Sequence, residues 1–235
     1  MSWLKKIISL LFPHICLLCE KPLPWEEEGP FCKECEKEVR YLAKEKVCKI
    51  CGKPLSSGLC EDCRRRRNKF DFSRSVALYE GKWREIIHLF KYRGLFTLSS
   101  YLGEKLWEVY RDNPIYETAD YIIPVPLTYW TRVKRGYHQT LLLANYLSRK
   151  TGKKVLRKVL YKSKNIPSQT GLSRKERLKN VRGAFKTRNS RIIKGKNILL
   201  IDDVLTTGAT VNECVKGLKK AGVKKVFVLT LARGE

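Results

Sequence analysis

Residues 197–210 read NILLIDDVLTTGAT, and this stretch decides the fold class. Four apolar residues run into two adjacent carboxylates, Asp202 and Asp203, and then into a run of Thr, Gly and Ala. A short continuous apolar run is typical of a strand whose two faces are both covered, as in a parallel sheet. The stretch therefore predicts a buried strand that ends at the two acids, followed by a small-residue loop that opens a helix.

The segments on either side of this stretch alternate between strand and helix patterns. Strands are expected at residues 70–80, 118–126, 154–161, 197–202 and 224–232, and helices at 82–93, 98–111, 137–150 and 210–220. Residues 162–190 are polar and are expected to form an excursion that contains a short helix. Because the strands are continuous apolar runs, the predicted fold class is α/β, with a parallel sheet flanked by helices.

The loop after the two acids has the composition of a sugar phosphate site. In open parallel sheets, ligands bind beyond the carboxyl ends of the strands, and a helix N-terminus presents unpaired N–H groups to a phosphate. The candidate phosphate ligands are Thr206, Thr207, Gly208, Ala209 and Thr210. Carboxylates accept hydrogen bonds from hydroxyl groups, so Asp202 and Asp203 suit the diol of a ribose 5-phosphate. A Walker loop and a dinucleotide-binding glycine fingerprint are both absent.

The N-terminal quarter carries eight cysteines in four C-x-x-C pairs. They are Cys16 and Cys19, Cys32 and Cys35, Cys48 and Cys51, and Cys60 and Cys63. This is the spacing of zinc knuckles, and CLLCEKPL at 16–23 returns as CKICGKPL at 48–55. The repeat favours two sequential sets of four ligands, while an interleaved arrangement stays open. Closed sites with four cysteines leave no open coordination position, so two structural zinc ions are expected.

Disulfide bonds are the alternative for these cysteines, and they need an oxidising compartment. Lys5 and Lys6 precede an apolar stretch at 7–12 that is too short for a signal peptide, and no cleavage site follows. A cytoplasmic protein without a membrane span is therefore expected. Residues 3–11 have helical spacing and are expected to form an amphipathic helix docked on the body, with a membrane-surface anchor as the alternative. Cys214 is expected to be a buried small hydrophobe.

The net charge of +26 in 235 residues predicts a strong attraction to polyanions. Aromatic and basic residues interleave in 129–137, and a second basic run begins at 64. Aromatic stacking within a positive groove holds single strands without sequence preference. The candidate DNA-binding residues are Trp130, Lys134, Tyr137, Arg64 and Arg65. In the other interpretation, Trp130 and Tyr137 pack in the core while the neighbouring cations bind pyrophosphate.

Several of these motifs resemble those of known families. ILLIDDVLTTGAT resembles the 5-phosphoribosyl-1-pyrophosphate (PRPP) motif of type I phosphoribosyltransferases. HLFKYRG at 88–94, IPVPLTYWTRVKRGYHQ at 123–139 and SQTGLSRKERLKNVRGAF at 168–185, together with the cysteine knuckles, resemble the ComF family of competence-associated proteins. Two departures are His138, where the family more often has Asn, and Ile166, where Thr is common.

The resemblance implies a type I phosphoribosyltransferase-like sheet behind a double zinc-ribbon domain, with a boundary between residues 1–67 and 68–235. It implies that Asp202 and Asp203 hold the ribose hydroxyls and are the candidate catalytic residues, and that residues 206–210 cradle the 5′-phosphate. The implied pyrophosphate loop is Val125, Pro126 and Leu127, assisted by Arg132 and Arg135. The implied flexible loop over the site contains Gln169, Arg174 and Arg177. Mg²⁺ is expected to bind together with PRPP.

The expected function is that of a ComF-type protein that binds single-stranded DNA and PRPP with Mg²⁺ in DNA uptake during natural transformation. The resemblance also suggests a helicase-like competence partner. Two alternatives stay open: a genuine nucleobase phosphoribosyltransferase of nucleotide salvage, and a zinc-ribbon adaptor whose PRPP-binding fold is a non-catalytic scaffold. The sequence supports PRPP binding better than transfer, because no base and no acceptor pocket can be assigned.

Overall fold

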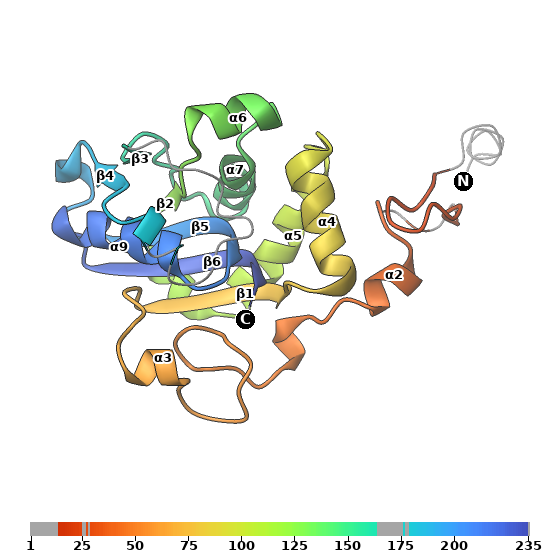
Figure 1. Ribbon diagram of the computed structural model, residues 1–235, viewed down its shortest axis with the longest axis horizontal. Coiled ribbons are helices and arrows are strands. Elements are labelled where there is room, and N and C mark those ends of the chain that lie inside the picture. The colour runs from red at the N-terminus through yellow and green to blue at the C-terminus, as the bar shows by residue number, and fades with distance from the viewer. Residues whose placement is uncertain (1–13, 25–26, 28, 164–175, 177–178, 235) are drawn as a thin grey trace.

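The centre of the computed structural model is a four-stranded parallel sheet (Figure 1). The structure describes residues 14–24, 27, 29–163, 176 and 179–234. The strands follow the spatial order β1 (Phe72–Leu78), β6 (Lys225–Arg233), β5 (Asn197–Leu205) and β2 (Tyr121–Pro124). This arrangement places β5, the strand of the opening sequence, in the interior of the sheet, which confirms the predicted α/β fold.

The apolar run of β5 is buried on both sides of the sheet. Leu199 and Ile201 face one core cluster, and Ile198 and Leu200 face the other, because successive strand residues point to opposite faces. All four of these side chains are inaccessible to solvent. This double burial explains why the sequence of the strand shows no alternation of apolar and polar residues.

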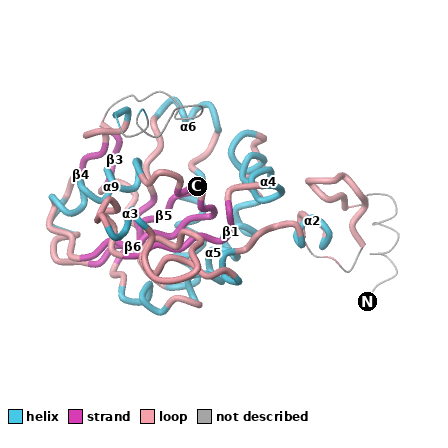
Figure 2. The backbone as a smooth tube through the Cα atoms, turned by 60° about the horizontal axis from the view of Figure 1, so that its bottom comes forward, coloured by secondary structure: helices cyan, strands magenta, loops and turns pink. Residues whose placement is uncertain are grey.

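Helices cover both faces of the sheet (Figures 1 and 2). The first core cluster is shared by α4 (Gly81–Tyr92), α5 (Leu98–Arg111) and α7 (Gln139–Thr151), and the second contains α9 (Ala209–Lys220). These bounds agree closely with the expected helices. A further short helix, α6 (Tyr129–Arg135), was not expected, and short 3₁₀ turns lie at Leu42–Lys44, Pro114–Thr118 and Ser190–Ile192.

The prediction of a strand at 154–161 is wrong over most of its length. Only Val155 bridges to β2, in a parallel sense, before the exposed residues Arg157 and Lys158 enter a turn. The chain then forms β3 (Leu160–Lys162), which pairs antiparallel with β4 (Phe185–Thr187) as a separate two-stranded sheet. The two consecutive charged residues interrupt the apolar run, so the segment turns away from the edge of the main sheet.

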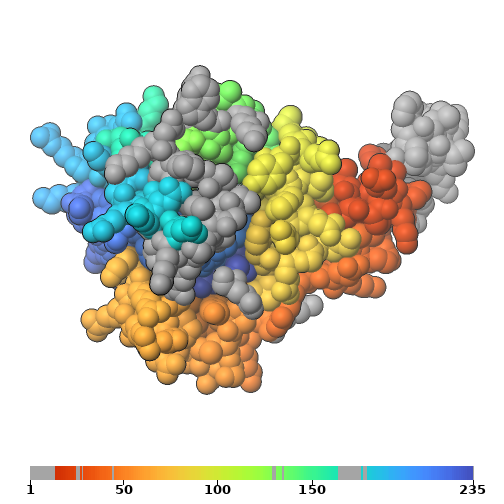
Figure 3. All heavy atoms as spheres, in the orientation of Figure 1, coloured from red at the N-terminus to blue at the C-terminus, as the bar shows by residue number. Residues whose placement is uncertain are grey.

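The two cysteine-rich ribbons dock at different places on the body. The first ribbon contains α2 (Lys33–Lys37) and contacts α5, where Tyr101 Oη donates to Glu36 Oε1 at 2.6 Å. The second contains α3 (Glu61–Arg64) and lies against β1, where Ser73 N donates to Ile50 O at 2.8 Å. The first ribbon extends to one side of the molecule (Figure 3), whereas the second lies below β1 in the view of Figure 1.

Two expectations fall outside the described residues: the amphipathic helix at 3–11, and most of the short helix expected within 162–190. Among the helices that the structure describes, none is both long and apolar enough to cross a bilayer.

Candidate functional site

The two acids lie at the carboxyl end of the central strand. The strand continues through them to Leu205, and Asp202 is 8% exposed. Asp203 N donates to Asp202 Oδ1 at 2.9 Å, and Lys91 Nζ lies 2.9 Å from Asp203 Oδ2. Sequence reasoning assigned no role to Lys91, although it is the lysine of the quoted HLFKYRG motif. The end of α4 therefore supplies a cation to the acidic pair.

The two carboxyl groups have different electrostatic surroundings. Burial raises the pKa of Asp202 to about 8, and the neighbouring Asp203 acts in the same direction, whereas the charges of Lys91 and Arg135 oppose the shift. Asp203 is paired directly with Lys91. A protonated carboxyl next to an ion-paired carboxylate offers both a hydrogen-bond donor and acceptors, which suits two neighbouring hydroxyl groups.

The candidate phosphate loop connects β5 to α9. Gly208 caps the helix with a φ of 73°, a left-handed conformation that favours glycine. Ala209 N donates to Thr207 Oγ1 at 3.3 Å, and the first turn of α9 begins immediately after this contact. The loop thus directs a helix N-terminus toward the same edge of the sheet as Asp202 and Asp203, a geometry suited to an anion.

The candidate pyrophosphate loop, residues 125–127, follows β2 on the neighbouring strand. Val125 N donates to Ile201 O at 2.9 Å, and Thr140 Oγ1 donates to Val125 O at 2.8 Å. These bonds hold the loop beside the strand that carries the acids. Pro126 and Leu127 continue the loop, and Thr128 caps α6 by accepting a hydrogen bond from Thr131 N at 3.1 Å.

Arg132 and Arg135 lie on α6 beyond this loop. Arg135 Nη1 donates to Gln139 Oε1 at 3.1 Å, and its charge acts on Asp202. Arg132 acts on the neighbouring His138. The structure therefore brings the predicted arginines, the loop after β2 and the acidic pair to one edge of the sheet.

His138 is one of the two departures from the ComF pattern, and its surroundings show how the fold accommodates it. It is the N-cap of α7, and its Nδ1 accepts a hydrogen bond from Leu141 N at 3.3 Å. Burial, together with the charge of Arg132, lowers the pKa of His138 to about 4. The ring is therefore neutral near pH 7 and can accept the helix N–H that an asparagine oxygen would accept at the same position.

The predicted flexible-loop residues Gln169, Arg174 and Arg177 lie outside the described residues.

The cysteines form two sequential tetrads, so the interleaved arrangement is not found. The sulfur atoms within each tetrad lie within 4.8 Å of one another: Cys16, Cys19, Cys32 and Cys35 in the first, and Cys48, Cys51, Cys60 and Cys63 in the second. No disulfide occurs among the described residues, and Cys214 is fully buried, as expected.

Both tetrads are suited to a metal that binds thiolates. Cys32 N donates to Cys16 Sγ at 3.3 Å, and Cys60 N donates to Cys48 Sγ at 3.4 Å. Burial acts to raise the pKa of Cys48, but hydrogen bonds from backbone N–H groups outweigh it and lower this pKa to about 6. Four clustered thiols with N–H groups directed at sulfur fit closed tetrahedral zinc sites.

The predicted DNA-binding residues do not form one surface. Arg64 and Arg65 lie on or beside α3, on the opposite side of the sheet from α6 (Figure 1). The half-buried Tyr137 donates its hydroxyl to Phe90 O and packs near the Phe90 ring. Tyr137 therefore contributes to packing, as the alternative interpretation held. Trp130 and Lys134 belong to α6, but their side chains are outside the described part of the structure.

A row of aromatic and cationic side chains follows the exposed side of α4, and sequence reasoning missed it. We call it the α4 row; it consists of Arg84, Tyr79, His88, Tyr92 and Arg135. Consecutive members lie 5.9, 6.2, 5.6 and 5.2 Å apart, measured between ring centroids or from a guanidinium carbon to a ring centroid. The four-residue spacing of Arg84, His88 and Tyr92 on one helix is the sequence signal that could have revealed it.

The fold and the site together define a phosphoribosyltransferase-like protein that carries a double zinc ribbon. Residues 7–66 match the double zinc ribbon domain family, and residues 117–235 match the phosphoribosyl transferase domain family. The chain belongs to the ComF family of competence proteins.

Three relatives are similar over nearly the whole chain. Competence protein F of Haemophilus influenzae is 30% identical, over 93% of this chain and 90% of that protein. Competence protein ComFC of Bacillus subtilis is 29% identical, over 93% of this chain and 95% of that protein. DNA utilization protein YhgH of Escherichia coli O6:H1 is 29% identical, over 95% of this chain and 99% of that protein.

Proposed function

We propose that this protein binds PRPP together with Mg²⁺ at the edge of the sheet formed by β5 and β2, and that it binds single-stranded DNA in DNA uptake. The observation that carries the first part is the position of Asp202 and Asp203. They lie on the central strand, immediately before a helix N-terminus and beside the loop after β2. The names of the relatives, which refer to competence and DNA utilization, support the second part.

Each group of PRPP has a proposed partner. The ribose hydroxyls bind Asp202 and Asp203, and the 5′-phosphate accepts hydrogen bonds from the loop of residues 206–210. The pyrophosphate lies against residues 125–127, where Arg132 and Arg135 offset its charge. Bound Mg²⁺ would offset the charge of the pyrophosphate and keep most of its waters. The loop with Gln169, Arg174 and Arg177 is proposed to close over the site.

The α4 row is the surface that we propose for single-stranded DNA, together with Trp130 and Lys134 of α6. Tyr92 is 56% exposed and lies between His88 and Arg135, so an exposed aromatic ring stands beside a cation. Sequence-tolerant binding of single strands uses this combination. Arg135 also contacts Gln139 near the proposed pyrophosphate loop, so the two ligands would lie next to each other. The first ribbon is the proposed docking surface for a helicase-like partner.

PRPP binding is tested by titration calorimetry in the presence of Mg²⁺. Asp203→Asn is expected to weaken binding at least 10-fold, because a charged hydrogen-bond acceptor is worth about 1.5–3 kcal/mol. The matched control is Asp112→Asn, at an exposed acid outside the site. Equal affinity of Asp203→Asn and the wild type would refute the ribose assignment.

DNA binding is tested with a labelled single strand over a series of salt concentrations. The logarithm of the affinity should fall with the logarithm of the salt concentration, with a slope of about −0.7 per phosphate contacted. Tyr92→Ala should weaken binding about 5-fold or more, since stacking on an aromatic side chain is worth about 1–3 kcal/mol per base. Ile192→Ala, at an exposed apolar side chain elsewhere, should leave binding unchanged. Binding that does not respond to salt would reject this part of the proposal.

Transfer of the ribosyl group is a separate question from binding. Pyrophosphate release from PRPP, measured across a panel of nucleobases, would distinguish a salvage transferase from a binding protein. Release that depends on one base would favour the transferase, and no release with any base would favour the binding protein.

A further inference from the structure

The proposed phosphate loop is attached at both of its ends to other segments of the chain, and one of these segments also contacts the second cysteine tetrad. At its beginning, Leu205 O accepts hydrogen bonds from Gly234 N at 3.0 Å and from Arg233 Nη1 at 3.5 Å. At its end, the loop meets the segment that leaves the second ribbon. These attachments come from residues 233–234 and 67–69, which are distant from the loop in the sequence, so they are tertiary contacts rather than local ones.

Asn212 attaches the first turn of α9 to the segment that follows α3. Its Oδ1 accepts a hydrogen bond from Lys69 N at 2.8 Å, and its Nδ2 donates to Arg67 O at 3.3 Å. The side chain is 9% exposed. One amide therefore satisfies a donor and an acceptor of the same short backbone segment, which fixes that segment against the start of the helix.

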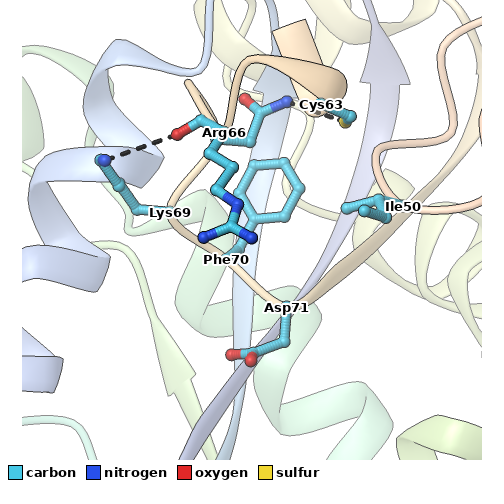
Figure 4. Close-up of a pocket in the computed structure, with 7 residues that line it drawn as sticks. Ile50, Cys63, Arg66, Lys69, Phe70 and Asp71 are labelled. Carbon is cyan, nitrogen blue, oxygen red and sulfur yellow. Dashed lines mark hydrogen bonds between the residues drawn. The ribbon is translucent and has the colours of Figure 1, made fainter. Parts of the chain in front are cut away.

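Asn68 lies between the two residues that Asn212 holds, and it reaches the metal site. Its Nδ2 donates to Cys63 Sγ at 3.3 Å. Its Oδ1 would lie 3.4 Å from a Cβ atom built on Gly208, the cap of the phosphate loop. One side chain therefore contacts a cysteine of the second tetrad and adjoins the phosphate loop. On the ribbon side of Asn68, Cys63, Lys69 and Phe70 line a pocket of about 370 Å³ (Figure 4).

Arg233 holds the other end of the loop. It is 7% exposed, and its Nη1 donates to Leu205 O at 3.5 Å. The beginning of the loop is therefore fixed by the last strand, whereas its end is fixed through Asn212 and the segment that carries Asn68.

We propose that the second zinc ribbon supports the phosphate loop through the positioning residue Asn68, so that metal binding at this ribbon and PRPP binding at the loop strengthen each other. The inference rests on the proposed PRPP site. Two binding events that share a support are linked reciprocally, and each raises the affinity of the other by the same factor. The first ribbon contacts α5 instead, through Tyr101 and Glu36, so its metal should not respond to PRPP.

The test measures how much zinc the full-length protein releases to a chelator at equilibrium, with and without saturating PRPP and Mg²⁺. Binding of PRPP is measured in parallel by calorimetry. In the wild type, PRPP should raise the affinity for one zinc equivalent about 5-fold or more, the lower end of typical coupling between sites, and leave the other unchanged. In Asn68→Ala, PRPP should still bind at a higher concentration, but its effect on zinc release should be lost.

Tyr101→Phe is the matched control, because it removes the hydrogen bond that connects the first ribbon to the body and should leave the PRPP effect intact. If Asn68→Ala folds poorly, Asn68→Ser keeps a donor for sulfur and should restore part of the effect. PRPP that binds the wild type without changing zinc release would overturn the coupling while leaving the proposed function standing. Absence of PRPP binding in the zinc-loaded wild type would overturn both.

Discussion

Lys91 Nζ contacts Asp203 Oδ2 at 2.9 Å, and the two side chains are only 11% and 15% exposed. The pair joins the last turn of α4 to the carboxyl end of β5. Three members of the α4 row, Arg84, His88 and Tyr92, lie on the same helix, and the proposed ribose site lies on the same strand. One ion pair therefore connects the two surfaces that we propose for DNA and PRPP.

Loss of Lys91 should destabilise the protein. Lys91→Met leaves the Asp203 carboxylate without its partner, and we expect the free energy of unfolding to fall by about 1–3 kcal/mol in urea titrations. The matched control is Lys82→Met on the same helix, where the pair with Glu85 is more exposed and should contribute less than about 1 kcal/mol. Equal effects of the two substitutions would contradict the buried character of the Lys91 pair.

The buried carboxyl of Asp202 should make stability depend on pH. Its pKa is raised from 3.8 to about 8 in the folded protein, so between these values the folded state keeps a proton that the unfolded state has lost. Its contribution to stability therefore falls as pH rises through this window, by at most about 1.4 kcal/mol per pH unit. Asp202→Asn should show a flatter dependence in urea titrations at several pH values. An unchanged slope would show that Asp202 does not titrate in this window.

His138 should contribute a pH dependence of the opposite sign. Its pKa is lowered from 6.5 to about 4, so the unfolded state binds the extra proton between these values and stability falls as pH falls. His138→Asn keeps an acceptor for Leu141 N and should remove this acid sensitivity. His138→Ala should also cost about 1 kcal/mol at pH 7, because the cap is lost. Equal stability of the two variants at pH 7 would refute the capping role.

Each cysteine tetrad should hold one zinc ion. Metal analysis of the purified protein should give two equivalents per chain, and Cys35→Ser or Cys63→Ser should each lower the content to one. Either variant should also be less stable, because metal binding contributes directly to the folding of such small ribbons. Cys214→Ala, outside both tetrads, should keep two equivalents. A single equivalent in the wild type would reject the two-site assignment.

The strand–loop–helix unit at 197–220 was predictable because its information is local: an apolar run, two acids, a glycine and a helical pattern. The sequential cysteine tetrads were likewise visible in the repeat. The partners of Asp203 and Cys63 were not, since Lys91 and Asn68 meet them only after the sheet and the second ribbon have assembled. The β3–β4 hairpin was also missed, because its short strands pair across a long excursion.

The second ribbon and the segment that precedes it also cover the outer edge of β1. Ser73 N bonds Ile50 O, Leu78 N bonds Arg40 O, and the Arg74 guanidinium contacts the carbonyls of Cys48 and Lys49. An uncovered edge strand is a template for pairing with another chain. Loss of zinc would therefore expose a row of backbone donors and acceptors in an otherwise folded domain. Metal starvation should make this protein self-associate before its central sheet unfolds.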